Sequence, residues 1–308
     1  MFIARIARAL ITVAFVLAIA APAAASIPPP APAPTATFDV GSLHVQQYGS
    51  GAKSLIFIPG LTCGPWEWSG EIAHFAPDYT VYALTLAGFD GQPSIAGPLF
   101  QTTSTNFWTL LDQKHIVKPV VIGHSLGGTM GFLLATQHPD RLAAVIALDG
   151  LPIYPTNIFS TPDKVKAFAG MAESAMANQT PAQFQAYELA NVLPSLITAQ
   201  SDVEAVAPLV GKSDPTASGK WFYEDLTMDL RPQLAQANVP ILLIAPYDVT
   251  LEGKYLPTIK DKQDFYAGII KNAPNASIVT IDHSRHFAMY DRPQALTDAI
   301  GQFLAKLP

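Results

Sequence analysis

The segment GHSLGG at residues 123–128 constrains the fold of this chain more than any other stretch. The apolar run KPVVI precedes it and predicts a buried strand, whereas TMGFLLATQHPDR follows it and predicts a helix. Its first five residues fit G-x-S-x-G, a sharp strand-to-helix turn that holds a serine in a strained backbone conformation. A phosphate-binding loop is the alternative, but GHSLGGTM lacks the lysine of such loops. We therefore predict that Ser125 is a nucleophile.

Short aliphatic runs alternate with helical patterns along most of the chain. This alternation is typical of a doubly wound, mostly parallel sheet in the α/β class. The clearest strands are expected at 54–59, 79–86, 118–123, 143–149, 239–246 and 276–282. Helical patterns such as STNFWTLLDQK lie between them, and DRPQALTDAIGQFLAKL closes the chain.

The alternation stops at residues 151–226, where consecutive helical patterns replace it. Thr161 and Thr180 are expected to cap two of these helices, because each precedes a proline at the first helical position. Helices inserted between neighbouring strands indicate a cap over the carboxyl edge of the sheet, where ligands bind in such folds. The core is therefore expected in two parts, 38–150 and 227–308, with the helical cap between them.

Residues 1–25 carry the pattern of a secretory signal peptide. Two arginines precede an apolar stretch at 9–20, and Ala23–Ala25 form a small-residue cleavage site. An uncleaved anchor is the weaker interpretation, because a membrane-spanning helix requires about 20 apolar residues. We expect export to the periplasm or out of the cell, with no stable membrane anchor after cleavage. The Pro-rich residues 26–37 are expected to form an extended tether.

The formal net charge is −6 at pH 7, and no basic stripe follows the leader. This distribution argues against nucleic acid and anionic membranes as partners. Cys63 is the single cysteine, so stability must come from the core rather than from an intramolecular disulfide. Hydrophobic residues make up 49% of the chain, which is enough to build such a core. Nothing in the composition indicates an oligomeric state.

With this turn between a strand and a helix, the chain resembles the α/β-hydrolase superfamily, specifically its capped esterase and lipase-like members. The resemblance covers residues from about 50 to 308 and implies a histidine base, an acidic partner and an oxyanion hole. His286 matches the family's closing pattern of His, Phe, a few residues, an acid and Pro, since the sequence reads RHFAMYDRP. His283 is the alternative base. No third ligand group accompanies these histidines, so we expect no metal and no cofactor.

The resemblance places the acid after the penultimate strand, where VPILLIAPYDVTLEG offers Asp248. Asp248 also lies between Ser125 and His286 in the chain, which is the order that this fold uses. The family often has Gly before the acid, and here a Pro-Tyr pair stands at that point. Two other acidic residues remain candidates for the partner of the histidine. Glu252 lies four residues on, and Asp149 ends an earlier strand, where local hydrogen bonds are the expected role.

An oxyanion hole requires two backbone N–H groups directed at the developing negative charge. The resemblance assigns one to Leu126, directly after the nucleophile, and the other to Leu61 in FIPGLTCGPWEW. A proline replaces the family's usual His in this loop, but a backbone donor does not depend on that side chain. Candidates for the wall of the substrate pocket, with plain packing as the alternative, are Trp66, Trp68 and Trp221.

These residues predict an exported serine hydrolase that cleaves small-molecule carboxylic esters through an acyl-enzyme. Other activities of the same triad remain open: aminopeptidase or amidase, lactonase, thioesterase and cofactor-free haloperoxidase. An aminopeptidase would need an acidic cap residue for the substrate ammonium, and the candidates are Glu188, Glu204 and Glu224. A non-catalytic, ligand-binding member of the superfamily is the alternative from another class.

Overall fold

The computed structural model describes residues 29–308. The predicted signal peptide and the first residues of the predicted tether lie outside this range. From residue 29 onward, the chain has no helix that is long and apolar enough to cross a membrane.

An eight-stranded sheet forms the centre of the described chain, with the strand order β1-β2-β4-β3-β5-β6-β7-β8. The pairs β1–β2 and β2–β4 are antiparallel, and all other neighbours are parallel. This sheet confirms the predicted α/β class. The strands are β1 (Ala36–Val40), β2 (Leu43–Tyr48), β3 (Ser54–Ile58), β4 (Thr80–Thr85), β5 (Val120–His124), β6 (Ala144–Leu148), β7 (Ile241–Tyr247) and β8 (Ala276–Asp282).

Each strand predicted from the sequence is present, from β3 to β8. The antiparallel strands β1 and β2 extend the sheet at one edge. β1 begins at Ala36, which pairs with Gln47 of β2. The end of the segment 26–37, which composition predicts to be a tether, is therefore part of the sheet, because backbone pairing orders it regardless of the prolines before it.

Two hydrophobic cores lie on the two faces of the sheet, because successive side chains of a strand point to opposite faces. In β3, Ile56 and Ile58 pack into the first core, and Leu55 and Phe57 pack into the second. The first core is covered by α2 (Leu99–Lys114), α3 (Leu126–Gln137) and α10 (Ile259–Ile270), and the second by α1 (Ser69–Phe75) and α12 (Pro293–Leu304).

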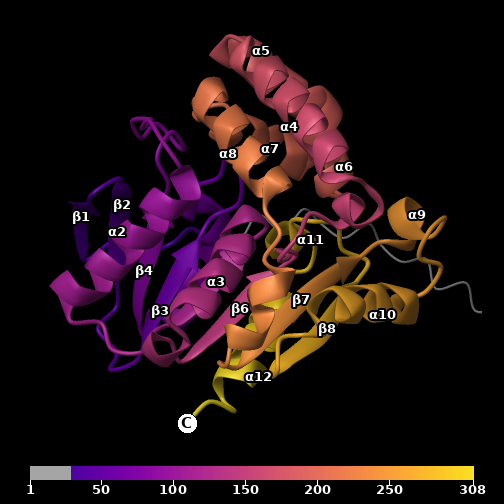
Figure 1. Cartoon of the computed structure of the whole chain (residues 1–308). Coiled ribbons are helices and arrows are strands. Elements are labelled where there is room, and N and C mark those ends of the chain that lie inside the picture. Colours follow the sequence, from indigo (N-terminus) through magenta and orange to yellow (C-terminus); the bar gives the residue numbers. More distant parts are fainter. Residues whose placement is uncertain (1–28) are drawn as a thin grey trace, which may run out of the picture.

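The helices of residues 162–227, between β6 and β7, stand together beyond one end of the strands (Figure 1). Thr180 caps one of them in a reciprocal pair of hydrogen bonds with Gln183, in agreement with the sequence. Thr161 also occupies a capping position, but its side chain makes no capping hydrogen bond. The elements are α4 (Pro162–Ala177), α5 (Pro181–Tyr187), the π-helical turn η4 (Glu188–Val192), α6 (Leu193–Leu196), α7 (Gln200–Val210) and α8 (Pro215–Thr227).

Short elements connect these parts of the fold. Two single-turn helices follow the last strands, α9 (Val249–Glu252) after β7 and α11 (Ala288–Asp291) after β8. The 3-10 turns are η1 (Pro65–Trp68), η2 (Pro139–Arg141), η3 (Pro155–Phe159) and η5 (Arg231–Gln236). The loops at the carboxyl ends of β3, β5, β6 and β8 carry the residues of the site described next.

Candidate active site

Ser125 lies at the turn between β5 and α3, where its backbone has φ 50° and ψ −118°. This conformation is strained for a residue with a side chain, and hydrogen bonds on both sides hold it. The Ser125 N–H donates to the Leu148 carbonyl at 2.8 Å, and the Ser125 carbonyl accepts from the N–H groups of Gly128 and Thr129. The turn that GHSLGG predicts is therefore present, with Ser125 at its tip.

Two glycines of this turn have no space for a side chain. A Cβ atom on Gly123 would lie 2.1 Å from the Gly127 carbonyl oxygen, and one on Gly127 would lie 2.3 Å from the Ile58 carbonyl oxygen. Both distances are far below van der Waals contact. The glycines thus allow the first turn of α3 to pack directly against β5 and β3, which fixes the position of Ser125.

His286 lies in the loop between β8 and α11 and lines the same cavity as Ser125. Its Nδ1 atom is 2.6 Å from Asp149 Oδ2. The alternative base, His283, pairs with Asp282 at 3.0 Å, and its side chain is 71% exposed. The structure therefore brings His286, and not His283, to the cavity of Ser125.

The acidic partner of His286 is Asp149, which contradicts the prediction of Asp248. Asp149 directly follows β6 and has an unusual backbone φ of 46°. Its Oδ2 atom contacts His286, and its Oδ1 atom accepts a hydrogen bond from the Tyr266 hydroxyl at 2.6 Å. Both carboxylate oxygens are thus held by side chains from distant parts of the sequence, rather than by the local hydrogen bonds expected for this residue.

Asp248 follows β7 as expected, but other groups bind its carboxylate. Its Oδ2 atom accepts from Arg285 Nε at 2.8 Å, and its Oδ1 atom accepts from the Thr250 N–H at the start of α9. The third candidate acid, Glu252, is paired with Lys262 at 2.6 Å. Neither Asp248 nor Glu252 is therefore available to orient His286.

The protonation states of Asp149 and His286 follow from their surroundings. Burial acts to raise the pKa of Asp149, but the charge of Lys262 and the hydrogen bonds from His286 and Tyr266 together hold it well below its usual range. Burial lowers the pKa of His286, and the neighbouring His124 lowers it further, against the raising effect of Asp149. At neutral pH the imidazole is therefore uncharged. Nδ1 carries its proton, because a carboxylate only accepts, and Nε2 is free to take another.

The predicted oxyanion donors are two backbone N–H groups close to Ser125. Leu126 is the first residue of α3, and Leu61 lies in the loop 59–64 after β3 (the oxyanion loop). This loop packs against the nucleophile, since a Cβ atom on Gly60 would lie 3.5 Å from Ser125 Cβ. Within residues 29–308, neither the Leu61 nor the Leu126 N–H has an acceptor. Both are free to donate to a ligand.

A buried network that was not predicted from the sequence supports the oxyanion loop. Glu67 of η1 is fully buried; its Oε1 atom accepts from the Gly60 N–H at 3.0 Å, and its Oε2 atom lies 3.1 Å from His124 Nδ1. His124 Nε2 in turn donates to the His286 carbonyl at 3.2 Å. Glu67 therefore connects the oxyanion loop to the loop that carries His286. The available signal was an acid between two tryptophans in PWEW, which does not by itself indicate such a network.

A cavity of about 710 Å³ lies between the cap and the residues described above. Ser125, His286, Asp149 and Leu61 all line it. The cap side of the cavity is mostly apolar and includes Phe168, Met176, Phe184, Leu193 and Phe222. The cavity therefore encloses an apolar space next to one nucleophile and one base.

The tryptophans predicted to wall the pocket do not line this cavity, so that prediction is wrong. Trp68 is fully buried and packs against Phe57 and His124. Trp221 is also fully buried, and its indole donates to the Ala87 carbonyl at 3.0 Å. Trp66 packs against the second core. Each ring lies on the core side of its own element, which agrees with the packing alternative.

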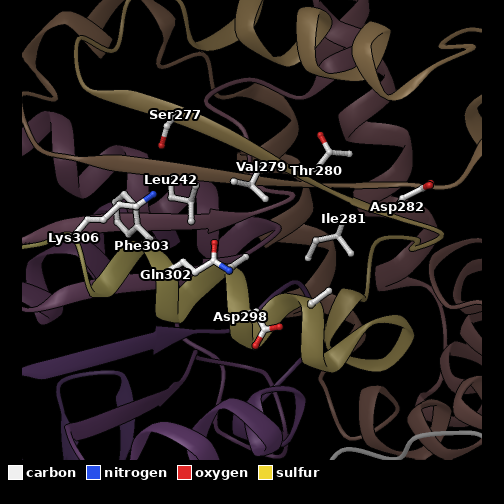
Figure 2. A pocket seen from close by; sticks show the side chains of 12 residues that line it. Leu242, Ser277, Val279, Thr280, Ile281, Asp282, Asp298, Gln302, Phe303 and Lys306 are labelled. Carbon is white, nitrogen blue, oxygen red and sulfur yellow. The ribbon is translucent and has the colours of Figure 1, made fainter.

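Another hollow, of about 450 Å³, lies between the edge strand β8 and α12. Figure 2 shows its polar side chains, among them Ser277, Thr280, Asp298 and Lys306. The described residues that line it include no predicted site residue, no histidine and no cysteine. This hollow has no histidine base for its serine, Ser277. The candidate active site is therefore the cavity under the cap.

Known proteins match this chain at low identity. Lipase LipV of Mycobacterium tuberculosis is 35% identical over 108 residues, which are 35% of this chain and 41% of LipV. The sn-1-specific diacylglycerol lipase ABHD11 of Mus musculus is 24% identical over 67% of this chain and 65% of its own length. The chain thus spans less than two thirds of either relative. The 3-oxoadipate enol-lactonase 2 of Acinetobacter baylyi is 22% identical over 86% of this chain and 94% of its own.

Solved structures share the fold. A thermophilic esterase from Thermogutta terrifontis superposes with a TM-score of 0.72 at 16% identity, over 88% of this chain and 98% of the esterase. The enol-lactonase from Burkholderia xenovorans superposes with a TM-score of 0.68 at 19% identity, over 90% of this chain and all of that structure. A family model described as the alpha/beta hydrolase family matches residues 55–299, which include the turn at Ser125 and the loop of His286. With this match over most of its length, the chain belongs to the alpha/beta hydrolase family.

Proposed function

We propose that the protein is a serine hydrolase that cleaves small-molecule carboxylic esters through an acyl-enzyme. The observation that carries the proposal is the 2.6 Å pair of His286 and Asp149 in the cavity that Ser125 also lines. Membership of the family supports a hydrolytic activity. The relatives named as lipases and an enol-lactonase agree with ester chemistry.

In the first step, Ser125 Oγ attacks the carbonyl carbon of the ester while His286 Nε2 takes the Oγ proton. The carbonyl oxygen becomes negatively charged and accepts hydrogen bonds from the Leu61 and Leu126 N–H groups. Asp149 stabilises the imidazolium that forms. His286 then gives this proton to the alkoxide oxygen as the carbon–oxygen bond breaks, so that the alcohol leaves and the acyl group stays on Ser125.

In the second step, water replaces the alcohol. His286 Nε2 takes a proton from water as its oxygen attacks the acyl carbon, and the same two N–H groups hold the oxyanion again. The bond to Ser125 Oγ then breaks, and His286 returns the proton to that oxygen. The acid is released and the enzyme regains its initial protonation state. Every proton transfer uses groups of this chain, the substrate or water.

Hydrolysis of p-nitrophenyl esters with increasing acyl length tests this function. We expect Ser125→Ala to abolish the activity, whereas Ser277→Ala, a change in the hollow beside β8, leaves it intact. A serine-reactive fluorophosphonate should label the wild-type protein on the peptide that contains Ser125. Retained hydrolysis by Ser125→Ala, or a label on another serine, would show that the nucleophile lies elsewhere.

We also propose that the protein is exported, on the basis of the pattern in residues 1–25. Expression of the full chain in a Gram-negative host, followed by fractionation and N-terminal sequencing, tests this proposal. The expected mature protein begins at Ser26 and lies outside the cytoplasm. Recovery of the uncleaved chain from the cytoplasmic fraction would contradict export.

A further inference from the structure

Glu188 lines the cavity, and its carboxylate has no hydrogen-bond or ion-pair partner among residues 29–308. Glu188 is the first residue of η4, is 7% exposed and lines the cavity under the cap. Burial raises its pKa to about 7, and no cation or donor opposes this effect within the described chain. A buried carboxylate is costly unless it is paired or hydrogen-bonded. Such a group in a ligand cavity is available to bind a cation.

The two other acidic cap residues considered from the sequence have structural partners. Glu224 accepts from the N–H groups of Leu99 and Phe100 at 2.7 and 2.9 Å, and thereby caps the first turn of α2. Glu204 is exposed and accepts from the Gln200 side chain at 3.1 Å. Neither residue lines the cavity. The structure therefore distinguishes Glu188 from both.

The remaining lining of the cavity also favours a cation. No lysine or arginine is among the described residues that line it. Its other acidic groups are Asp149, which pairs with His286, and Asp225, whose pKa burial raises to about 7. Carboxylates without neighbouring cations attract positive ligands and repel anionic ones. The lining further includes aromatic rings, whose faces attract cations, at Tyr154, Tyr187 and Phe222.

We propose that Glu188 binds the ammonium group of a cationic ester and thereby determines the substrate class of this hydrolase. The proposal rests on the function proposed above for Ser125. An ammonium group occurs on the acyl side of some esters, as in aminoacyl esters, and on the alcohol side of others, as in choline esters. The chemistry that Glu188 recognises is the same in both, so the test contains one arm for each.

The test compares charged esters with neutral isosteres at about pH 8, where Glu188 is mostly ionised. In the acyl arm, p-nitrophenyl esters of 6-aminohexanoic acid, heptanoic acid and adipic acid are cationic, neutral and anionic. In the alcohol arm, butyrylcholine is compared with 3,3-dimethylbutyl butyrate. We expect the wild type to prefer the cation in one arm by about tenfold or more in kcat/KM. The anionic ester should be the poorest substrate.

The neutral variant Glu188→Gln should lose this preference, so that its kcat/KM values for the cationic and the neutral ester become similar. The control Glu204→Gln changes an exposed acid of the same cap and should behave as wild type. Equal activity of the wild type on the cationic and neutral esters in both arms would overturn the proposal. So would a preference that survives in Glu188→Gln.

A binding measurement separates this proposal from the proposed function. Calorimetric titration of Ser125→Ala with hexylammonium and with 1-hexanol should show tighter binding of the cation. The double variant Ser125→Ala/Glu188→Gln should lose that difference. If no ester is hydrolysed but this difference is found, the ester function fails and the cation site stands. If neutral esters are hydrolysed but no difference is found, the ester function stands and the cation site fails.

Discussion

His286 Nδ1 and Asp149 Oδ2 lie 2.6 Å apart and join residues 137 positions apart in the sequence. Asp149 directly follows β6 and Asp248 directly follows β7, which are parallel neighbours, so both acids emerge at the same edge of the sheet. Arg285 binds Asp248, whereas the Tyr266 hydroxyl binds Asp149 and leaves its second oxygen for His286. The neighbours of each acid therefore determine which one orients the imidazole.

Asp149→Asn should lower kcat for ester hydrolysis by about 10³- to 10⁴-fold, because an amide cannot hold Nδ1–H of His286 and stabilise the imidazolium as a carboxylate does. Asp248→Asn is the matched control and should change kcat by less than about tenfold, since Asp248 does not contact His286. Steady-state kinetics on p-nitrophenyl butyrate compares the two variants. A larger loss in Asp248→Asn than in Asp149→Asn would overturn the assignment.

The pH profile of kcat/KM should have its acidic limb below pH 6.5, the ordinary pKa of histidine, because burial and His124 lower the pKa of His286. Activity requires the neutral imidazole. It is therefore present above the lowered pKa and lost as the pH falls through it. Asp149→Asn removes a group that raises this pKa, so the residual activity of that variant should extend to still lower pH. A limb above pH 6.5 in the wild type would contradict the lowered pKa.

The turn at Ser125 and the loop of His286 could be predicted because their signals are local. A strand, G-x-S-x-G and a helix follow one another directly, and RHFAMYDRP lies directly after the last strand. The strands from β3 to β8 were predictable for the same reason, since each is a short run rich in aliphatic or β-branched residues. These features required no knowledge of distant contacts.

The acid could not be predicted, because the choice depends on contacts between distant residues. The Tyr266 hydroxyl reaches Asp149 over 117 positions, and no local pattern connects them. The pocket tryptophans were misplaced for a related reason. The spacing of the tryptophans in PWEW does not show which ring faces the core, and Trp68 packs against Phe57 beneath the loop. Glu67 was missed because its partners lie on two other segments.

Glu67→Ala should lower kcat by about tenfold to a hundredfold with a smaller change in KM, because the oxyanion loop loses the acceptor of the Gly60 N–H. Glu67→Gln keeps an oxygen for that N–H and should recover most of the activity. Titration of active sites with a fluorophosphonate gives kcat per competent molecule, so that partial unfolding does not count as lost catalysis. An unchanged kcat per active site in Glu67→Ala would mean that Glu67 serves stability alone.

Glu71→Gln should stabilise the protein at pH 8 and have little effect at pH 5. Burial raises the pKa of Glu71 from 4.5 to about 8, and the Glu67 carboxylate adds to this effect, against a backbone hydrogen bond that lowers it. Between pH 4.5 and about pH 8, Glu71 keeps its proton in the folded state and releases it in the unfolded state. The free energy of unfolding therefore falls as the pH rises, by at most about 1.4 kcal/mol per pH unit from this group.

Thermal unfolding of the wild type, Glu71→Gln and the exposed control Glu204→Gln at both pH values tests this linkage. Glutamine cannot ionise, so the gain in midpoint temperature for Glu71→Gln should appear at pH 8 and shrink toward pH 5. The control should give the same midpoint as the wild type at each pH. A gain of equal size at both pH values would mean that packing, rather than the proton on Glu71, accounts for the change, because only a titrating group makes the difference depend on pH.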